Sequence, residues 1–310
     1  MSPHGVLIVD KPTGPTSHDV VARARRVFKT RAVGHAGTLD PLASGVLLVL
    51  VGEATKLSSW LTLASKRYQT RMRLGAESDT LDAQGTLREV RYAQPTEEQV
   101  SAALAEEKLR TSQVPPSVSA IKVDGQRAYD LTRKGEAPEL PPRNVSVQEL
   151  ELLSADEREL ELRLTVSKGY YVRALARDLA QRLDTAGYLT ELRRLASGPF
   201  GIEEAVGWPP EEPPALLSVS EAARRSLPVA ELNEEGNARA ACGKRLDGTC
   251  FTSPPPLHPE TPSASEPPVA WYHASRLVAL GRAEGELFRV VRGFNPELCG
   301  ELSSPLALPG

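Results

Sequence analysis

The sequence contains only three cysteines, Cys242, Cys250 and Cys299, and none of them belongs to a CxxC pair. Three thiols cannot form a closed set of disulfides, and structural zinc sites normally use paired cysteines or histidines. We therefore expect three reduced thiols and no bound metal, as in a protein of a reducing compartment.

Long hydrophobic segments are also missing. No stretch approaches the roughly 18 uninterrupted apolar residues of a membrane helix. The first residues, MSPHGVLIVDKP, lack the basic region and the long apolar run of a secretory signal. We therefore expect a protein of the cytoplasm without a membrane span.

What is present is an ordinary globular composition in a long chain. Hydrophobic residues make up 40% and charged residues 25% of the 310 residues, which excludes a wholly disordered chain. A chain of this length exceeds the size at which one hydrophobic core usually stops growing. Two unequal domains are therefore expected.

Charge is unevenly distributed along the chain. The net charge is −3, which by itself argues against nucleic-acid binding. Residues 1–74, however, hold 11 Lys and Arg against 4 Asp and Glu, and residues 163–194 hold 7 against 3. Because the local field of a patch steers association, two basic surfaces suit a polyanionic partner. Two ordinary solvated faces are the alternative interpretation.

Hydrophobic periodicity indicates interleaved strands and helices. Two apolar runs, GVLIVD and GVLLVLVG, and two alternating segments, 68–74 and 159–166, are typical of strands. Helices are predicted at three places: after a cap at Thr16 or Ser17, over 96–110, and through VRALARDLAQRL. The irregular order of these elements favours an α+β fold over a doubly wound parallel sheet.

The remaining segments indicate the domain organisation. Residues 113–143 are rich in Pro, Gly and basic residues and form a long excursion from the core. A Pro- and Glu-rich connector follows residue 199, and we expect a first domain over 1–228 and a second over 229–310. The second domain has short β-like runs typical of a small barrel, interrupted at about 252–268 by a Pro/Ser-rich loop that we expect to be disordered.

The segment GHAGTLDPLASG is the best candidate for chemistry. Asp40 precedes Pro41, which favours an extended backbone, and the glycines on either side permit tight turns or the close approach of a ligand. A carboxylate on such a loop can be catalytic. An Asp-Pro turn between two core elements would give the same pattern.

Other kinds of catalytic site are not evident in the sequence. We find no second acidic residue in a similarly constrained loop, so the paired carboxylates of a glycosidase are not expected. Nucleophile elbows, phosphate-binding loops, zinc-binding helices and dinucleotide fingerprints are absent. His35 has no partner at ligand spacing, which favours a hydrogen-bonded or substrate-contacting role over metal binding. The remaining hypothesis is a single aspartate, Asp40, that acts without metal or cofactor among arginines and tyrosines.

Five segments, in fixed order, resemble the motifs of the bacterial TruB family of tRNA pseudouridine synthases: GVLIVDKPTGPTS, GHAGTLDPLASGVLLVLVGEATK, KRYQTRMRLGAESDTLDAQG, SKGYYVRALARDLA and YLTELRRLASGPF. They cover most of residues 5–200. The tail from about 230 to 294 resembles a small RNA-binding β-barrel of PUA type. The resemblance implies a pseudouridine-synthase fold, with a mixed and largely antiparallel sheet flanked by helices, and isomerisation of uridine 55 in the T loop of tRNA.

The resemblance implies three catalytic residues. Asp40 matches the family's nucleophile, which attacks the target uridine so that the base detaches, turns and rejoins its ribose through C5. Tyr68 matches a tyrosine that stacks on the base and is a candidate for removing the C5 proton. Arg173 matches the arginine that keeps the aspartate ionised and oriented. Neither a cofactor nor a metal is implied.

Five further positions match binding or supporting residues of the family. His35, Tyr171 and Leu192 are implied to lie around the flipped base. Lys11 and Pro12 match the family's KP motif, which we interpret as support beneath the catalytic loop.

Residues 113–143 resemble the family's thumb-like insertion, which clamps the RNA arm, but Val118 stands where relatives commonly carry an aromatic side chain. Phosphate contacts are expected there from five basic residues: Lys122, Arg127, Arg133, Lys134 and Arg143. We expect a monomer that binds the T arm of tRNA without an obligate protein partner. The alternatives are a non-catalytic tRNA-binding or folding chaperone and an RNA-guided rRNA pseudouridine synthase.

Overall fold

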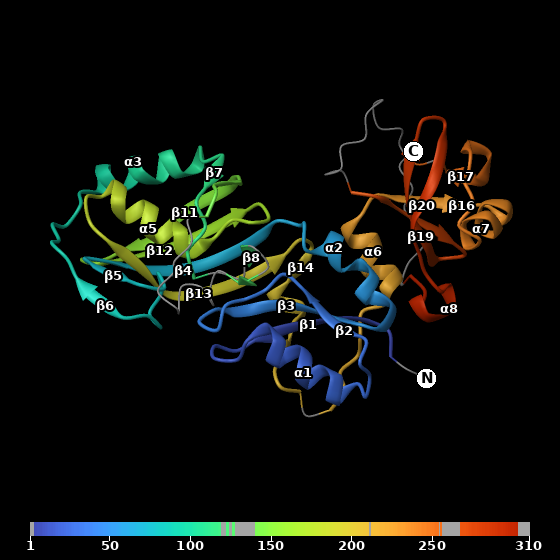
Figure 1. The fold of residues 1–310 in the computed structure, drawn as a ribbon, viewed down its shortest axis with the longest axis horizontal. Helices are drawn as coiled ribbons and strands as arrows, with labels where there is room; N and C mark the ends of the chain where they lie inside the picture. The colour runs from blue at the N-terminus through green and yellow to red at the C-terminus, as the bar shows by residue number, and fades with distance from the viewer. Residues whose placement is uncertain are drawn as a thin grey trace.

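The computed structural model of the chain describes residues 3–118, 122–123, 126–127, 140–210, 212–253, 255 and 267–302. Two sheets of unequal size lie side by side, and helices cover them (Figure 1). The larger sheet contains the segments that sequence analysis connects with catalysis. The smaller sheet is formed by the last quarter of the chain, drawn in orange and red.

The larger sheet has nine strands: β1 (Gly5–Lys11), β2 (Val33–Ala36), β3 (Ser44–Val51), β4 (Lys66–Leu74), β11 (Val147–Ala155), β12 (Glu159–Val166), β13 (Gly187–Ser197), β14 (Phe200–Gly201) and β15 (Val206–Gly207). Their order is β11-β12-β4-β13-β3-β1-β15, with β2 also paired to β3 and β14 to β13. Only β1–β15 and β13–β3 run parallel in this sheet. The predicted α+β fold with a mixed, largely antiparallel sheet is therefore confirmed.

The helices connected to this sheet are α1 (Ser17–Val27), η1 (Gly52–Leu57), α2 (Ser58–Leu61), α3 (Glu97–Lys108), α5 (Val172–Arg182), η2 (Ile202–Glu204) and α6 (Val219–Ser226). Thr16 caps α1 and Thr96 caps α3, each through a capping box, so both predicted helix starts are confirmed. Three short ladders complete this part: β5 (Ala76–Ser78) with β6 (Leu87–Glu89), β7 (Ser112–Gln113) with β10 (Arg143–Asn144), and β8 (Lys122–Val123) with β9 (Gln126–Arg127).

The smaller sheet has the order β17-β16-β18-β19-β20. Its elements are β16 (Val229–Leu232), α7 (Glu234–Ala241), η3 (Gly248–Cys250), β17 (Phe251–Ser253), β18 (Val269–His273), β19 (Arg276–Glu284), β20 (Leu287–Gly293) and α8 (Pro296–Cys299). The predicted β-like runs are present as this open five-stranded sheet. Its likeness to a PUA barrel, and the division of the chain at residue 228, stay predictions.

The strands β1 and β3 are buried on both faces, which explains their uninterrupted apolar runs. On one face, side chains such as Leu7, Val9 and Val49 share a core with α1, α3 and α5. On the other face, alternate residues such as Ile8 and Leu48 share a second core with α6 and with β18 and β19 of the smaller sheet. A third core lies on the opposite side of β18 around Trp271, Phe251 and Phe288, three rings that meet edge to face.

Two predicted segments lie mostly outside the described residues. Of the insertion 113–143, the described parts are its two ends and the β8–β9 ladder, so Arg133 and Lys134 are not described. Of the Pro/Ser-rich loop 252–268, residues 254 and 256–266 lie outside the described residues. The three cysteines are described, and all three are free thiols, as predicted. No described helix combines the length and the apolar character that a membrane crossing requires.

Candidate active site

Asp40 lies in the loop that connects β2 to β3, and its two neighbours in the chain are held from outside the loop. The Oγ atom of Ser17, buried at the first position of α1, donates a hydrogen bond to the carbonyl oxygen of Leu39 (3.1 Å) and accepts one from the amide of Leu39 (2.8 Å). The amide of Gly14 donates to the carbonyl oxygen of Pro41 at 2.8 Å. The start of α1 and the turn before it therefore fix the backbone on both sides of Asp40.

Arg173 lies in the first turn of α5 and forms an ion pair with Asp40. Its Nε atom donates to Oδ2 of Asp40 at 2.9 Å, and its Nη1 atom donates to the carbonyl oxygen of Thr80 at 3.0 Å. The side chain of Arg173 is 7% exposed, whereas that of Asp40 is 39% exposed. The guanidinium is thus buried and fixed, while the carboxylate that it orients stays accessible to a ligand. The family resemblance implies this pairing.

A second carboxylate, Asp82, faces the same guanidinium, so the prediction that no second acidic residue lies in a constrained loop is wrong. Oδ2 of Asp82 lies 3.7 Å from Nε of Arg173, and the side chain is 7% exposed. Its Oδ1 atom accepts from Oγ1 of Thr80 (2.6 Å) and from the amide of Gln84 (3.0 Å). The motif SDTLDAQG contains this aspartate, but an aspartate in a short Asx turn gives the same sequence pattern as a carboxylate of the active site.

Tyr68 lies on β4 and Leu192 on β13, two neighbouring strands in the middle of the larger sheet. The register pairs Tyr68 on β4 with Arg194 on β13, and Arg194 in turn with Gly45 on β3. Leu192 is on β13, opposite Thr70. Both Tyr68 and Leu192 are at most 9% exposed and belong to the core shared with α1 and α5. The sheet therefore brings Tyr68 within two strands of the C-terminal end of the Asp40 loop.

Lys11 lies at the end of β1 and is fully buried. Its Nζ atom donates to the carbonyl oxygens of Pro12 and Pro15, each at 2.8 Å, so it supports the turn that leads to α1. Burial lowers the pKa of Lys11 to about 8, and the negative charge of Asp40 partly opposes this shift. Pro12 itself is exposed. This arrangement agrees with a supporting role for the lysine.

His35, on β2, is half-buried beside the exposed His18, with the two rings edge to face at 5.6 Å between centroids. Within the described residues, the buried Nδ1 atom of His35 has no hydrogen-bond partner. Burial lowers the pKa of His35, which favours the neutral ring. A neutral imidazole with an unused nitrogen suits contact with a ligand better than a structural hydrogen bond.

Tyr171 precedes α5 and is tied to the base of the insertion. The side chain of Gln113, 2% exposed on β7, accepts from the amide of Tyr171 (2.8 Å) and donates to its carbonyl oxygen (3.2 Å). Burial raises the pKa of the Tyr171 phenol, so this ring is neutral near pH 7. Gln113 was not predicted, because a glutamine that binds backbone leaves no pattern in a sequence.

Several basic residues that the charge count included are in the interior. Lys11, Lys66, Arg173 and Arg194 are all at most 7% exposed, so they cannot supply surface charge for RNA phosphates. The exposed cations of these two segments include Arg23, Arg25, Arg26, Lys29, Arg67 and Lys168. The basic surface is thus smaller than the sequence suggests.

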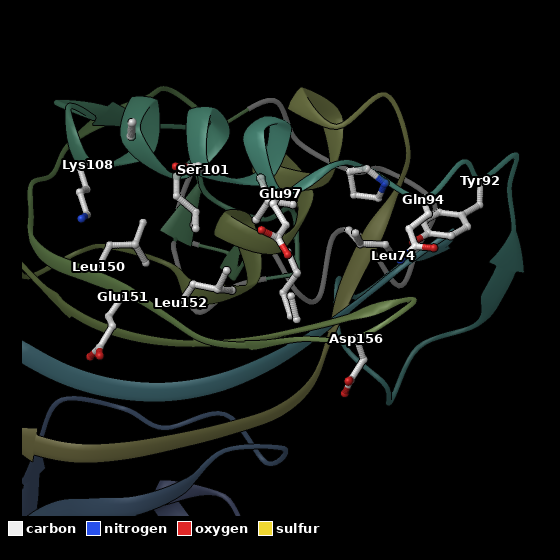
Figure 2. A pocket seen from close by; sticks show the side chains of 16 residues that line it. Leu74, Tyr92, Gln94, Glu97, Ser101, Lys108, Leu150, Glu151, Leu152 and Asp156 are labelled. Atoms are coloured by element: carbon white, nitrogen blue, oxygen red, sulfur yellow. The ribbon is translucent and has the colours of Figure 1, made fainter.

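A large cavity of about 950 Å³ lies elsewhere, between α3 and the edge strand β11 (Figure 2). Figure 2 shows Ser101 and Lys108 on α3 above Leu150 and Leu152 of β11. None of the eight predicted site residues lines this cavity. Among the described residues there is also no cluster of three or more His, Cys, Asp or Glu side chains that could hold a metal ion.

Comparison with protein families gives the class of protein. A family model described as "TruB family pseudouridylate synthase (N terminal domain)" matches residues 25–172. In fold, the chain resembles a chain of "a Cbf5-Nop10-Gar1 Complex", with a TM-score of 0.71 and 25% identity over 96% of this chain and 88% of that one. A chain of "the archaeal box H/ACA sRNP Nop10-Cbf5 complex" gives a TM-score of 0.68 at 25% identity, covering 97% and 89%. The fold is that of the pseudouridine synthases.

Sequence relatives narrow the class to one family. The tRNA pseudouridine synthase B of Mycolicibacterium paratuberculosis is 45% identical over 260 residues, which cover 80% of this chain and 89% of the relative. The tRNA pseudouridine synthase B of Mycobacterium avium is 47% identical over 252 residues, covering 77% and 82%. The chain belongs to the TruB family. Its activity is the formation of pseudouridine in tRNA, an isomerisation.

Proposed function

We propose that Asp40 is the nucleophile of this isomerisation and that the target is uridine 55 in the T loop of tRNA. The observation that carries the proposal is the 2.9 Å ion pair between the buried Arg173 and the accessible Asp40. A buried, fixed guanidinium keeps the carboxylate of Asp40 in one orientation, which a nucleophile requires. The target position is supported by the family to which the chain belongs.

The overall change balances without an oxidant or reductant. The bond between N1 of uracil and C1′ of the ribose breaks, a bond between C5 and C1′ forms, C5 loses a proton and N1 gains one. The carboxylate of Asp40 provides a temporary covalent partner while the base turns. Substrate and product therefore have the same atomic composition.

Tyr68 is proposed to stack on the base and to take the C5 proton. Its ring is largely buried on β4, two strands from the Asp40 loop, so it is held rigidly where an extruded base could lie against it. His35, Tyr171 and Leu192 are proposed to contact the same base, with the unpartnered Nδ1 of His35 available to a polar group. Lys11 and Pro12 shape the turn beneath the loop.

Recognition is proposed to depend on RNA shape and phosphate contacts. Extruding uridine 55 costs roughly a few kcal/mol, which stacking and pocket hydrogen bonds offset. The catalytic domain would comprise residues 1–228, with the insertion 113–143 clamping the T arm, and residues 229–310 would form a PUA-like RNA-binding domain. The protein would act in the cytoplasm as a monomer without an obligate protein partner.

Mass mapping of pseudouridine in a tRNA transcript treated with the purified protein tests this proposal. We expect one new pseudouridine, at position 55. Modification at another position would contradict the proposed target, and no modification at all would favour a non-catalytic chaperone. Modification only in the presence of a guide RNA would favour an RNA-guided pseudouridine synthase.

A further inference from the structure

Arg194 is a buried arginine that donates three hydrogen bonds to the backbone around the Asp40 loop. It lies on β13 and is 1% exposed. Its Nη2 atom donates to the carbonyl oxygen of Gly37 (3.0 Å), its Nη1 atom to that of Thr38 (3.3 Å) and its Nε atom to that of Val46 (2.6 Å). Across the described residues, no carboxylate lies within ion-pair distance of this guanidinium.

These three contacts connect the two ends of the loop to each other. Gly37 and Thr38 lie just before Asp40, and Val46 follows the loop in β3. The backbone of Arg194 also packs closely against the backbone of Gly45. A Cβ atom on Gly45 would lie 2.2 Å from the carbonyl oxygen of Arg194, so only glycine fits there. A single rigid, planar group therefore fixes the distance between the arms of the loop.

A purely structural role does not explain why a charged side chain without an acidic partner is buried here. Burying a guanidinium is costly, and a well-packed apolar side chain of similar volume is often as stable or more so. The positive charge of Arg194 also contributes, after burial, to the lowered pKa values of Lys11, Lys66 and His35. The chain thus tolerates an unfavourable charge at a place where a guanidinium reaches both arms of the loop.

We propose that Arg194 is a positioning residue for Asp40: it sets the shape of the loop so that the carboxylate reaches the target uridine. This proposal rests on Asp40 as the nucleophile. Arg194 acts through the backbone and does not touch the substrate. Ser17 holds Leu39 independently, so loss of Arg194 loosens the arms of the loop without releasing its centre.

A lysine cannot replace this group. Three carbonyl oxygens are contacted by three different nitrogen atoms of one plane, whereas an ammonium group presents its donors from a single point. Arg194→Lys keeps the charge and removes the geometry. Arg194→Gln removes the charge, keeps an amide donor, and avoids leaving an unpaired ammonium in the interior should Arg194→Lys fail to fold.

The test is the single-turnover rate of pseudouridine formation on a T-arm RNA hairpin, with the full chain in excess. We expect Arg194→Lys and Arg194→Gln to lower the rate by about 10- to 100-fold, because small displacements of a reacting group have effects of this size. RNA affinity should stay within about threefold, since the rate loss comes from positioning. Hydrogen exchange of the amides of residues 37–46 should become faster in both variants.

Two control variants separate positioning from folding. Arg163→Lys makes the same change on β12, at an exposed guanidinium that pairs with Glu151 at 3.4 Å and not with the loop, and should keep the wild-type rate. Leu160→Ala removes a buried side chain on β12 and lowers stability, and should keep both the rate and the exchange of residues 37–46. A wild-type rate in a folded Arg194 variant, or an equal loss in Leu160→Ala, would overturn the proposal. Pseudouridine formation by Asp40→Asn would instead contradict the assignment of Asp40 as the nucleophile, independently of the results for the Arg194 variants.

Discussion

Arg173 donates a hydrogen bond from Nε to Oδ2 of Asp40 at 2.9 Å, across 133 positions of the sequence. The two residues come from α5 and from the loop between β2 and β3, and the nine-stranded sheet brings these elements together. The contact therefore exists only in the folded protein. It makes a loop aspartate with an ordinary turn sequence into a fixed, accessible anion.

Replacing Arg173 by lysine should remove most of the activity. The guanidinium contacts Asp40 and the carbonyl oxygen of Thr80 through different nitrogen atoms, and it faces Asp82 at 3.7 Å. A lysine cannot reproduce this geometry, so we expect the single-turnover rate to fall by roughly 100-fold. RNA affinity should change little. A rate within about twofold of wild type would show that the ion pair is dispensable.

Asp82→Asn should have a smaller effect of the same kind. The amide oxygen can still accept from Thr80 and from the amide of Gln84, but the negative charge near Arg173 is lost. Arg173 is then oriented by Asp40 and Thr80 alone, and we expect a rate loss of about 10-fold with unchanged RNA affinity. Asp79→Asn, in the same turn but without contact to Arg173, is the matched control. Equal losses in both variants would assign the effect to the turn.

RNA binding should weaken steeply with salt. Exposed arginines on α1 and β4 can neutralise phosphates, and each such contact releases counterions. With three or more contacts, the affinity for a T-arm RNA should fall by at least about 10-fold between roughly 50 and 200 mM salt. Fluorescence anisotropy measures this. A flat dependence would mean that phosphate contacts contribute little.

The free energy of unfolding should rise with pH above about 8, partly because of Lys66. Burial lowers the pKa of Lys66 from 10.5 to about 8 in the folded protein. Between these values the unfolded chain binds more protons than the folded one, so stability increases with pH, by roughly 1 to 3 kcal/mol over the window. Below pH 8 both states are protonated, and the cost of the buried charge is fully present.

Urea unfolding at about pH 7.5, 8.5 and 9.5 measures this effect for the wild type and for Lys66→Met. The difference between the two curves isolates Lys66 from other groups such as Lys11, whose pKa is also lowered to about 8. We expect the wild type to gain stability relative to the variant as the pH rises. Parallel curves would show that Lys66 has an ordinary pKa in the folded state.

The sequence predicts the elements of this fold well because their patterns are local. Alternation on β4 and β12, the apolar runs of β1 and β3, and the capping boxes at Thr16 and Thr96 each depend on a few neighbouring residues. Long-range pairing is not local. The residues that the family motifs single out were predicted, whereas Asp82, Gln113 and the loop contacts of Arg194 depend on the register of strands far apart in the chain.

Arg194 shows where a signal existed but was missed. In the segment ELRRLAS, Leu192 and Arg194 share a buried face of β13 by simple alternation. An arginine at an inward position is expensive unless its donors are satisfied, so the pattern indicates a buried partner set. The sequence cannot say which carbonyl groups those are. They belong to the Asp40 loop and to the start of β3, about 150 residues earlier in the chain.

The most direct test of the account is Asp40→Asn, measured by pseudouridine formation on a T-arm RNA at saturating enzyme. Asparagine keeps the size of the side chain and removes the anion, so no product should form, while RNA affinity should stay within about threefold of wild type. Product formation by this variant at a rate near that of the wild type would show that the carboxylate of Asp40 is not the nucleophile.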